Sequence, residues 1–175
     1  MYDDYHSPGT RHMTAVTLLL LGMVTGSIAQ AADTVPAIGP LPPVTVNPDN
    51  PPTEARIALG RSIFFDNRIS DSGTINCATC HIPSLGWTVP TPISPAHPGK
   101  IERRNSPTLL NVGYVSALIW DGRAPSLEKQ ALGSLKNPVH KNQDIEKLIK
   151  IYNDDPDMVR LFRAAYGTAP NPDDI

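Results

Sequence analysis

Two thiols and an imidazole stand close together in this chain, as Cys77, Cys80 and His81 of the run Cys-Ala-Thr-Cys-His. Thiols at this spacing match the separation of the two haem vinyl groups, to which they add as thioethers. The adjacent histidine is then placed beneath the iron as an axial ligand. The motif predicts one covalently attached haem c, bound through Cys77 and Cys80, with His81 as the proximal iron ligand.

Three other interpretations of the two cysteines were weighed. A structural disulfide is compatible with an oxidising compartment. A thioredoxin-type dithiol needs a βαβ context, which the sequence pattern does not show. A zinc site needs further ligands at suitable spacing, and the chain has only 2 cysteines. We therefore favour haem as the group bound by the two cysteines. A haem motif also argues against a purely structural, non-redox domain.

The N-terminal residues 1–31 have the pattern of a secretory signal peptide. Arg11 and His12 precede an apolar stretch, and Ala29-Gln30-Ala31 offers the small residues that a signal peptidase recognises. The apolar stretch is short for a membrane span, which needs about 20 residues, although an uncleaved anchor is the alternative. The expectation is export to the periplasm.

Few other side chains of the mature chain could bind the iron. His97 lies in the stiff loop Pro95-Ala96-His97-Pro98-Gly99, where it could occupy the distal side of the haem or stay exposed to solvent. Met158 stands on an amphipathic pattern, and we expect core packing rather than ligation. Taken alone, Trp120 is expected in ordinary packing and His140 on the surface.

The elements expected to position these residues are helices and long loops, without a convincing strand pair. Residues 32–52 form a proline-rich linker, because so many prolines cannot continue a helix. The fold class is all-α, with a long ordered loop over 82–108 and helices over about 54–65, 127–136, 142–152 and 156–166.

Composition limits both the core and the partners. With 19 prolines and 6% aromatic residues, a conventional core would be thin, and an enclosed cofactor would supply apolar contact area. Lys and Arg number 15 against 17 Asp and Glu, and no basic stripe is present. Nucleic acid is therefore not expected as a partner.

Several motifs together resemble the N-terminal haem domain of bacterial di-haem cytochrome c peroxidases and their MauG-type relatives. The resemblance covers residues 53–175 and implies a cytochrome c-like haem domain. The matching runs are Leu59-Gly60-Arg61-Ser62-Ile63-Phe64-Phe65-Asp66, Ile75-Asn76-Cys77-Ala78-Thr79-Cys80-His81, Arg104-Asn105-Ser106-Pro107-Thr108-Leu109-Leu110-Asn111, Trp120-Asp121-Gly122-Arg123-Ala124, Ser126-Leu127-Glu128-Lys129-Gln130-Ala131 and Asn137-Pro138-Val139.

The resemblance implies roles for individual residues. His81 matches the proximal ligand of the peroxide-reacting haem, and His97 falls where many members have a removable distal ligand. Trp120 matches a tryptophan that passes electrons between two haems. Gln130 matches a glutamine of the distal pocket, and Asn105 a side chain near a calcium site.

Two departures from the family pattern stand out. The acid–base glutamate expected after Asn-Pro-x is replaced by His140, which could shuttle protons near neutral pH or bind the iron instead. A second Cys-x-x-Cys-His is absent, and the chain ends at Ile175. The expectation is a truncated domain, 53–175, without its electron-supplying half.

The resemblance implies a haem peroxidase that reduces hydrogen peroxide to water with electrons from a small cytochrome c or cupredoxin. His140, Gln130 and Trp120 are the candidate catalytic residues, and calcium and a homodimer are further expectations. Two alternatives stay open: an electron carrier whose sixth iron position is filled by His97 or His140, and a MauG-type oxidase of protein side chains.

Overall fold

The computed structural model describes residues 39–175, so the expected signal peptide and the first residues of the linker lie outside the described residues. The linker from residue 39 to residue 46 is exposed and has no regular secondary structure, as its prolines predict. Within the described residues there are α-helices, short 3-10 turns and no extended strand. The all-α fold class is confirmed.

Helix α2, Glu54–Phe65, begins and ends at residues whose side chains bind backbone amides. The hydroxyl of Thr53 accepts a hydrogen bond from the amide of Arg56 at 3.3 Å. After the helix, the Asp66 carboxylate accepts from the amide of Arg68 at 2.8 Å and begins the 3-10 turn η1, Asn67–Ile69. The expected bounds of this helix are confirmed.

The other helices are α3, Leu127–Lys136, α4, Ile145–Asn153, and α5, Pro156–Tyr166. Ser126 caps α3, and Gly167, with φ of 81°, ends α5 in the left-handed region, which agrees with the expected ranges 127–136 and 156–166.

The expected start of α4 near residue 142 is wrong. Asn142 adopts a left-handed φ of 49°, which asparagine tolerates better than most residues. The cap is Asp144, whose carboxylate accepts from the amide of Lys147 at 3.2 Å. Residues 142 and 143 therefore belong to the turn before the helix.

The main core joins the helices. Helix α2 packs against α5, and α5 packs against α4. The buried cluster that results contains Leu59, Ile69, Leu135, Leu148, Tyr152, Met158 and Phe162. Met158, only 2% exposed, is confirmed as a core residue. No helix among residues 39–175 is long and apolar enough to cross a membrane.

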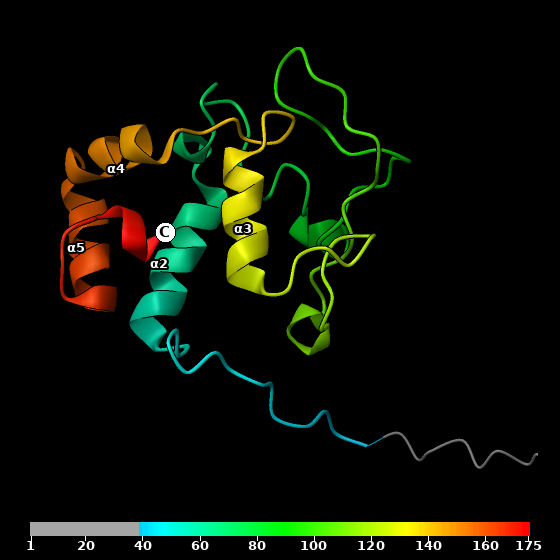
Figure 1. Cartoon of the computed structure of the whole chain (residues 1–175), viewed down its shortest axis with the longest axis horizontal. Helices are drawn as coiled ribbons and strands as arrows, with labels where there is room; N and C mark the ends of the chain where they lie inside the picture. Colours follow the sequence, from blue (N-terminus) through cyan, green and yellow to red (C-terminus); the bar gives the residue numbers. More distant parts are fainter. Residues whose placement is uncertain (1–38) are drawn as a thin grey trace, which may run out of the picture. The chain divides into compact units, whose positions relative to one another are not determined.

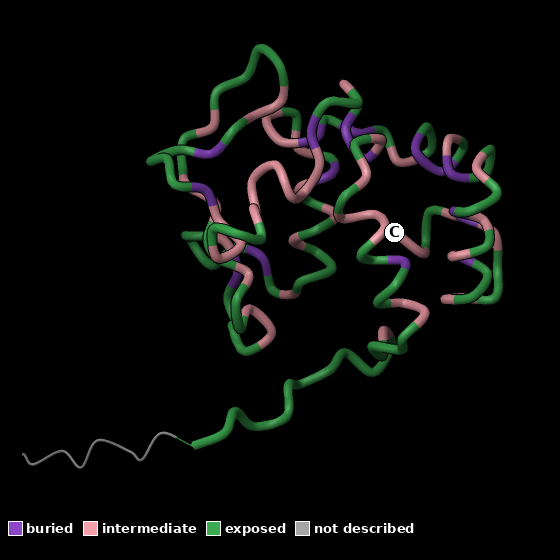
Figure 2. Tube along the Cα trace, turned by 180° about the vertical axis from the view of Figure 1, so that it is seen from behind, coloured by how far each residue is buried: buried purple, intermediate pink, exposed green. Residues whose placement is uncertain are grey.

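Residues 82–125 form a long loop that lies to one side of the helices (Figure 1). It contains the 3-10 turns η2, Pro83–Leu85, and η3, Val112–Tyr114, and two isolated bridges, Ile82–Thr88 and Leu118–Ala124. Most of its length is exposed or half-buried (Figure 2). The expected long loop over 82–108 is confirmed, and it continues to residue 125.

Candidate haem site and adjoining pocket

The Cys77–His81 motif forms a helical turn that is attached to the end of α2. The amide of Cys77 donates to the carbonyl of Phe64 at 3.1 Å, and the amide of His81 donates to the carbonyl of Cys77 at 2.9 Å. Both cysteines are free thiols. Burial raises the pKa of Cys77 and of Cys80, so both thiols are neutral near neutral pH.

The ring of His81 is oriented by a backbone carbonyl. Its Nδ1 lies 3.1 Å from the carbonyl oxygen of Trp87, which can only accept a hydrogen bond. The proton is therefore on Nδ1, and Nε2 is left with a free lone pair, as in most metal-binding histidines. Burial lowers the pKa of His81, which favours the neutral form that binds iron.

Trp87 presents this carbonyl from a strained backbone. Its φ is 61°, in the left-handed region that a bulky side chain rarely adopts. The amide of Trp87 donates to the carbonyl of Ile82 at 2.9 Å, and the amide of Ile82 donates to the carbonyl of Thr88 at 3.2 Å. The indole ring of Trp87 packs edge-on against the ring of Phe64, with 5.7 Å between the ring centroids.

His97 is half-buried, and both of its ring nitrogens are buried without a hydrogen-bond partner among the described residues. Such an imidazole is costly unless a ligand satisfies one nitrogen. Its loop lies against the motif, because the Cys80 thiol donates to the carbonyl of Pro95 at 3.4 Å. Of the two alternatives for His97, the fully solvent-exposed loop histidine is not what the structure shows, and the distal ligand stays a prediction.

The side chains present fit a covalently bound haem. Free thiols stand at the required spacing, His81 offers Nε2, and His97 offers buried ring nitrogens without a partner among the described residues. Cys77, Cys80 and His81 would hold the group, and His97 would offer a further nitrogen to the iron.

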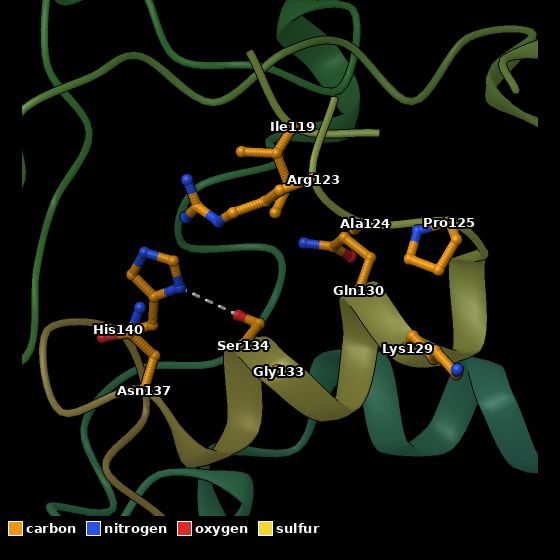
Figure 3. A pocket seen from close by; sticks show the side chains of 10 residues that line it. All are labelled: Ile119, Arg123, Ala124, Pro125, Lys129, Gln130, Gly133, Ser134, Asn137 and His140. Atoms are coloured by element: carbon orange, nitrogen blue, oxygen red, sulfur yellow. Dashed lines mark hydrogen bonds between the residues drawn. The ribbon is translucent and has the colours of Figure 1, made fainter. Parts of the chain in front are cut away.

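A pocket of about 370 Å³ lies beside α3 (Figure 3). It is lined by Ile119, Arg123, Ala124, Pro125, Lys129, Gln130, Gly133, Ser134, Asn137 and His140. The structure thus brings together Gln130 and His140, which the sequence analysis had paired. The pocket is next to the His97 loop, because the amide of His97 donates to the carbonyl of Val139 at 2.8 Å.

Two partners of His140 were not predicted. Its Nδ1 lies 3.3 Å from the hydroxyl of Ser134, and its Nε2 lies 2.7 Å from the carboxylate of Glu102. Ser134 could have been found from the sequence, because it follows Gln130 by one helical turn. No sequence signal connects Glu102 to this pocket. His140 is half-buried and paired, rather than a free histidine on the surface, and its catalytic role stays a prediction.

Trp120 does not line the pocket, and its side chain is not packed in a core, since the residue is 63% exposed. It projects from a tight turn in which Ile119 has a φ of 67°, a strained value for a β-branched residue. The indole N–H donates to the carbonyl of Asn105 at 2.7 Å. The expectation of ordinary packing for Trp120 is wrong.

Asn105 uses its amide group within the loop. Its nitrogen donates to the carbonyls of Val89 and Thr91 at 3.0 and 2.6 Å, and its oxygen accepts from the Thr88 hydroxyl at 3.1 Å. No cluster of three His, Cys, Asp or Glu side chains that could hold a metal ion occurs within residues 39–175. Calcium near Asn105 stays a prediction.

The family model described as di-haem cytochrome c peroxidase matches residues 54–175. The chain belongs to this family. It is 38% identical over 159 residues to a cytochrome-c peroxidase of Denitromonas iodatirespirans, covering 89% of this chain and 42% of that protein. It is also 38% identical over 130 residues to the methylamine utilization protein MauG of Methylorubrum extorquens, covering 68% of this chain and 34% of that protein.

Solved structures agree with the assignment to the di-haem peroxidase family. A MauG-like protein associated with microbial copper homeostasis aligns with a TM-score of 0.70 and 30% identity, over 75% of this chain and 39% of that one. The diheme peroxidase BthA of Burkholderia thailandensis aligns with a TM-score of 0.61 and 28% identity, over 73% of this chain and 37% of that one. The chain thus spans less than half the length of these relatives.

Proposed function

We propose that this chain is the peroxide-reacting haem domain of a periplasmic cytochrome c peroxidase. In this proposal it reduces hydrogen peroxide to water with electrons from a small cytochrome c or cupredoxin. Membership of the di-haem peroxidase family supports a haem-dependent role. The observation that supports the site is the pair of buried His97 ring nitrogens, which have no partner among the described residues, in a loop beside the Cys77–His81 motif.

The chain's own residues would bind the substrate and manage its protons. Peroxide reduction consumes two electrons and two protons, and bound haem would transfer to peroxide the electrons that the small redox protein supplies. The amide of Gln130 would orient a peroxide molecule in the pocket, and His140, which carries a basic ring nitrogen, would accept and return a proton. The exposed indole of Trp120 is accessible to a redox partner and would pass electrons inward.

The decisive test concerns His97, using the full chain with haem attached. If His97 is the removable sixth ligand, His97→Gly should convert a low-spin resting haem to high-spin and give access to carbon monoxide after reduction. The optical spectrum and the rate of peroxide consumption report the two effects.

Two outcomes would count against the peroxidase proposal. A haem that stays low-spin in His97→Gly would make His140 the sixth ligand, since Met158 lies in the helical core. A wild-type haem that rejects carbon monoxide after reduction, and does not consume peroxide, would favour the electron carrier instead. Oxidation of a protein side chain without peroxide turnover to water would favour the MauG-type activity.

Several expectations remain proposals beside this one. They are the signal peptide 1–31, the linker 32–52, the haem domain 53–175, calcium near Asn105 and a homodimer. An intact mass of the exported protein would test the cleavage site and the number of haems together.

A further inference from the structure

Glu102 is the carboxylate that contacts the pocket histidine. It lies in the same loop as His97, five residues further along, and its side chain is 18% exposed. Its Oε2 is 2.7 Å from Nε2 of His140, whose side chain is 34% exposed. A hydrogen bond of this length to a largely buried carboxylate is strong and directional.

The contact determines which nitrogen of His140 carries the proton. An ionised carboxylate only accepts hydrogen bonds, so the nitrogen that faces it, Nε2, must be protonated. Burial alone would raise the pKa of Glu102, but hydrogen bonds from the amide of Arg103 and from the His140 ring outweigh it and lower the pKa. In the neutral imidazole, Nδ1 is therefore the basic nitrogen.

That basic nitrogen is on the pocket side of the ring. Nδ1 lies 3.3 Å from the Ser134 hydroxyl, and Figure 3 shows His140 and Ser134 turned toward one another at the pocket. The hydrogen bond that Ser134 can donate to Nδ1 is long, and rotation of the Ser134 hydroxyl frees the Nδ1 lone pair for a proton. The tautomer imposed by Glu102 is thus the one that can accept a proton from a molecule in the pocket.

We propose that Glu102 is a positioning residue, which holds His140 with Nδ1 as the proton-accepting atom of the pocket. This inference rests on the proposed peroxidase function. A proton passes from the peroxide O–H to Nδ1, and the imidazolium that results is paired with Glu102. The same proton then moves to the oxygen that departs as the first water when the O–O bond breaks. Two electrons from the small redox protein and two protons from solvent convert the remaining oxygen to the second water.

The first experiment reads the tautomer directly in the full chain with haem attached. The protein is labelled with ¹⁵N-histidine, reduced and saturated with carbon monoxide, so that the iron is diamagnetic with either carbon monoxide or histidine as sixth ligand. The chain has only 5 histidines, so the ring nitrogens can be assigned by substitution. Wild type should show His140 with the proton on Nε2. Glu102→Met, which removes the acceptor, should give a mixture of the two tautomers.

The second experiment measures peroxide turnover in the same variants. Glu102→Met should lower kcat at least about tenfold with little change in KM. A general acid–base group contributes about 100- to 10,000-fold to the rate, and losing the correct tautomer should remove part of that contribution. Glu102→Gln retains a carbonyl acceptor for Nε2–H, so it should keep the tautomer and recover part of kcat. Asp157→Asn breaks an exposed ion pair with Arg160 and serves as the matched control, unchanged in both measurements.

Each result has a definite meaning. A single Nε2–H tautomer in Glu102→Met, or an unchanged kcat in that variant, would overturn the positioning role. An equal loss in Glu102→Gln and Glu102→Met would also overturn it, because the hydrogen-bond acceptor would then be irrelevant. If wild type shows the expected tautomer and Glu102→Met mixes it, but neither consumes peroxide, the peroxidase function fails while the Glu102–His140 pairing stands.

Discussion

The helical region, residues 53–69 with 127–166, and the loop region, residues 82–125, are stabilised by different interactions. All residues of the main buried cluster come from the helical region. In the loop region only Val89, Ser94, Leu118 and Ala124 are buried, and none of them belongs to the main cluster. Its segments are instead joined by side chains that bind backbone groups, above all Asn105.

Backbone strain is concentrated in the loop region. Trp87, Asn111 and Ile119 all have positive φ there, and outside it only Asn142 among the described non-glycine residues does. Each such residue costs about 1–3 kcal/mol and persists where surrounding contacts determine it. Trp87 orients His81 and Ile119 precedes Trp120, so the strain occurs beside predicted functional groups. The helical region provides a stable base on which the loop region can hold strained conformations.

The largest expected effect tests the packing of the helical region. Phe162 is fully buried, with its ring 6.0 Å from that of Tyr152. Phe162→Ala should lower the free energy of unfolding by about 3–5 kcal/mol, because it leaves a cavity between the helices. Trp120→Ala in the loop region should lower it by less than about 1.5 kcal/mol, since it loses mainly one hydrogen bond. Urea unfolding followed by circular dichroism measures both, and similar losses would refute the contrast.

An effect of intermediate size is expected for asparagine side chains that donate to backbone carbonyls, a contact that occurs in both regions. Asn105 donates to the carbonyls of Val89 and Thr91, and Asn153 donates to those of Ile149 and Pro170. Asn105→Ala should cost about 1–3 kcal/mol of local stability and speed hydrogen exchange throughout residues 86–106, because the lost contacts join loop segments. Asn153→Ala should affect only the end of α4 and its neighbours. Protection that survives around residue 105 would show that other contacts hold the loop.

The helical region was largely predictable from local sequence signals. Thr53 and Ser126 are caps, and Gly167 is a stop, each acting within one helical turn of itself. The start of α4 was misjudged because the apolar periodicity gives no sign that Asn142 takes the left-handed conformation. Local signals therefore sufficed wherever the deciding contact was local.

The candidate site follows the same rule: its local motif was predictable from the sequence, and its long-range contacts were not. Cys77, Cys80 and His81 form a contiguous motif, so their chemistry could be inferred from spacing alone. The contact between Glu102 and His140 joins residues 38 positions apart, and it depends on how the loop folds back on the turn before α4. Burial of the two His97 ring nitrogens depends on the same folding, which no local pattern encodes.

The smallest expected effect concerns acid and the ion pairs of the two regions. In the helical region Arg68 binds Asp66 and Asp155, both at 2.8 Å, and in the loop region Arg104 binds Asp121 at 3.0 Å. The hydrogen bond from Arg68 lowers the pKa of Asp155 below its ordinary value of 3.8. At Asp121, where burial would raise the pKa, hydrogen bonds from Arg104 and Arg123 outweigh it and lower the pKa.

A carboxylate with a lowered folded-state pKa stabilises the fold above its unfolded pKa, and this stability is lost as the pH falls through the folded value. Arg68→Met should therefore flatten the decline of global stability below pH 3.8, because Arg68 joins Asp66, the C-cap of α2, to Asp155, the N-cap of α5. Arg104→Met should leave global unfolding nearly unchanged and only speed hydrogen exchange near residue 121, because its partner lies within the loop region. Thermal unfolding as a function of pH measures global stability in both variants, and hydrogen exchange measures the local change near residue 121. If Arg104→Met flattened the acid limb as much as Arg68→Met, the two regions would unfold as one unit, and the loop region would contribute to global stability as much as the helices.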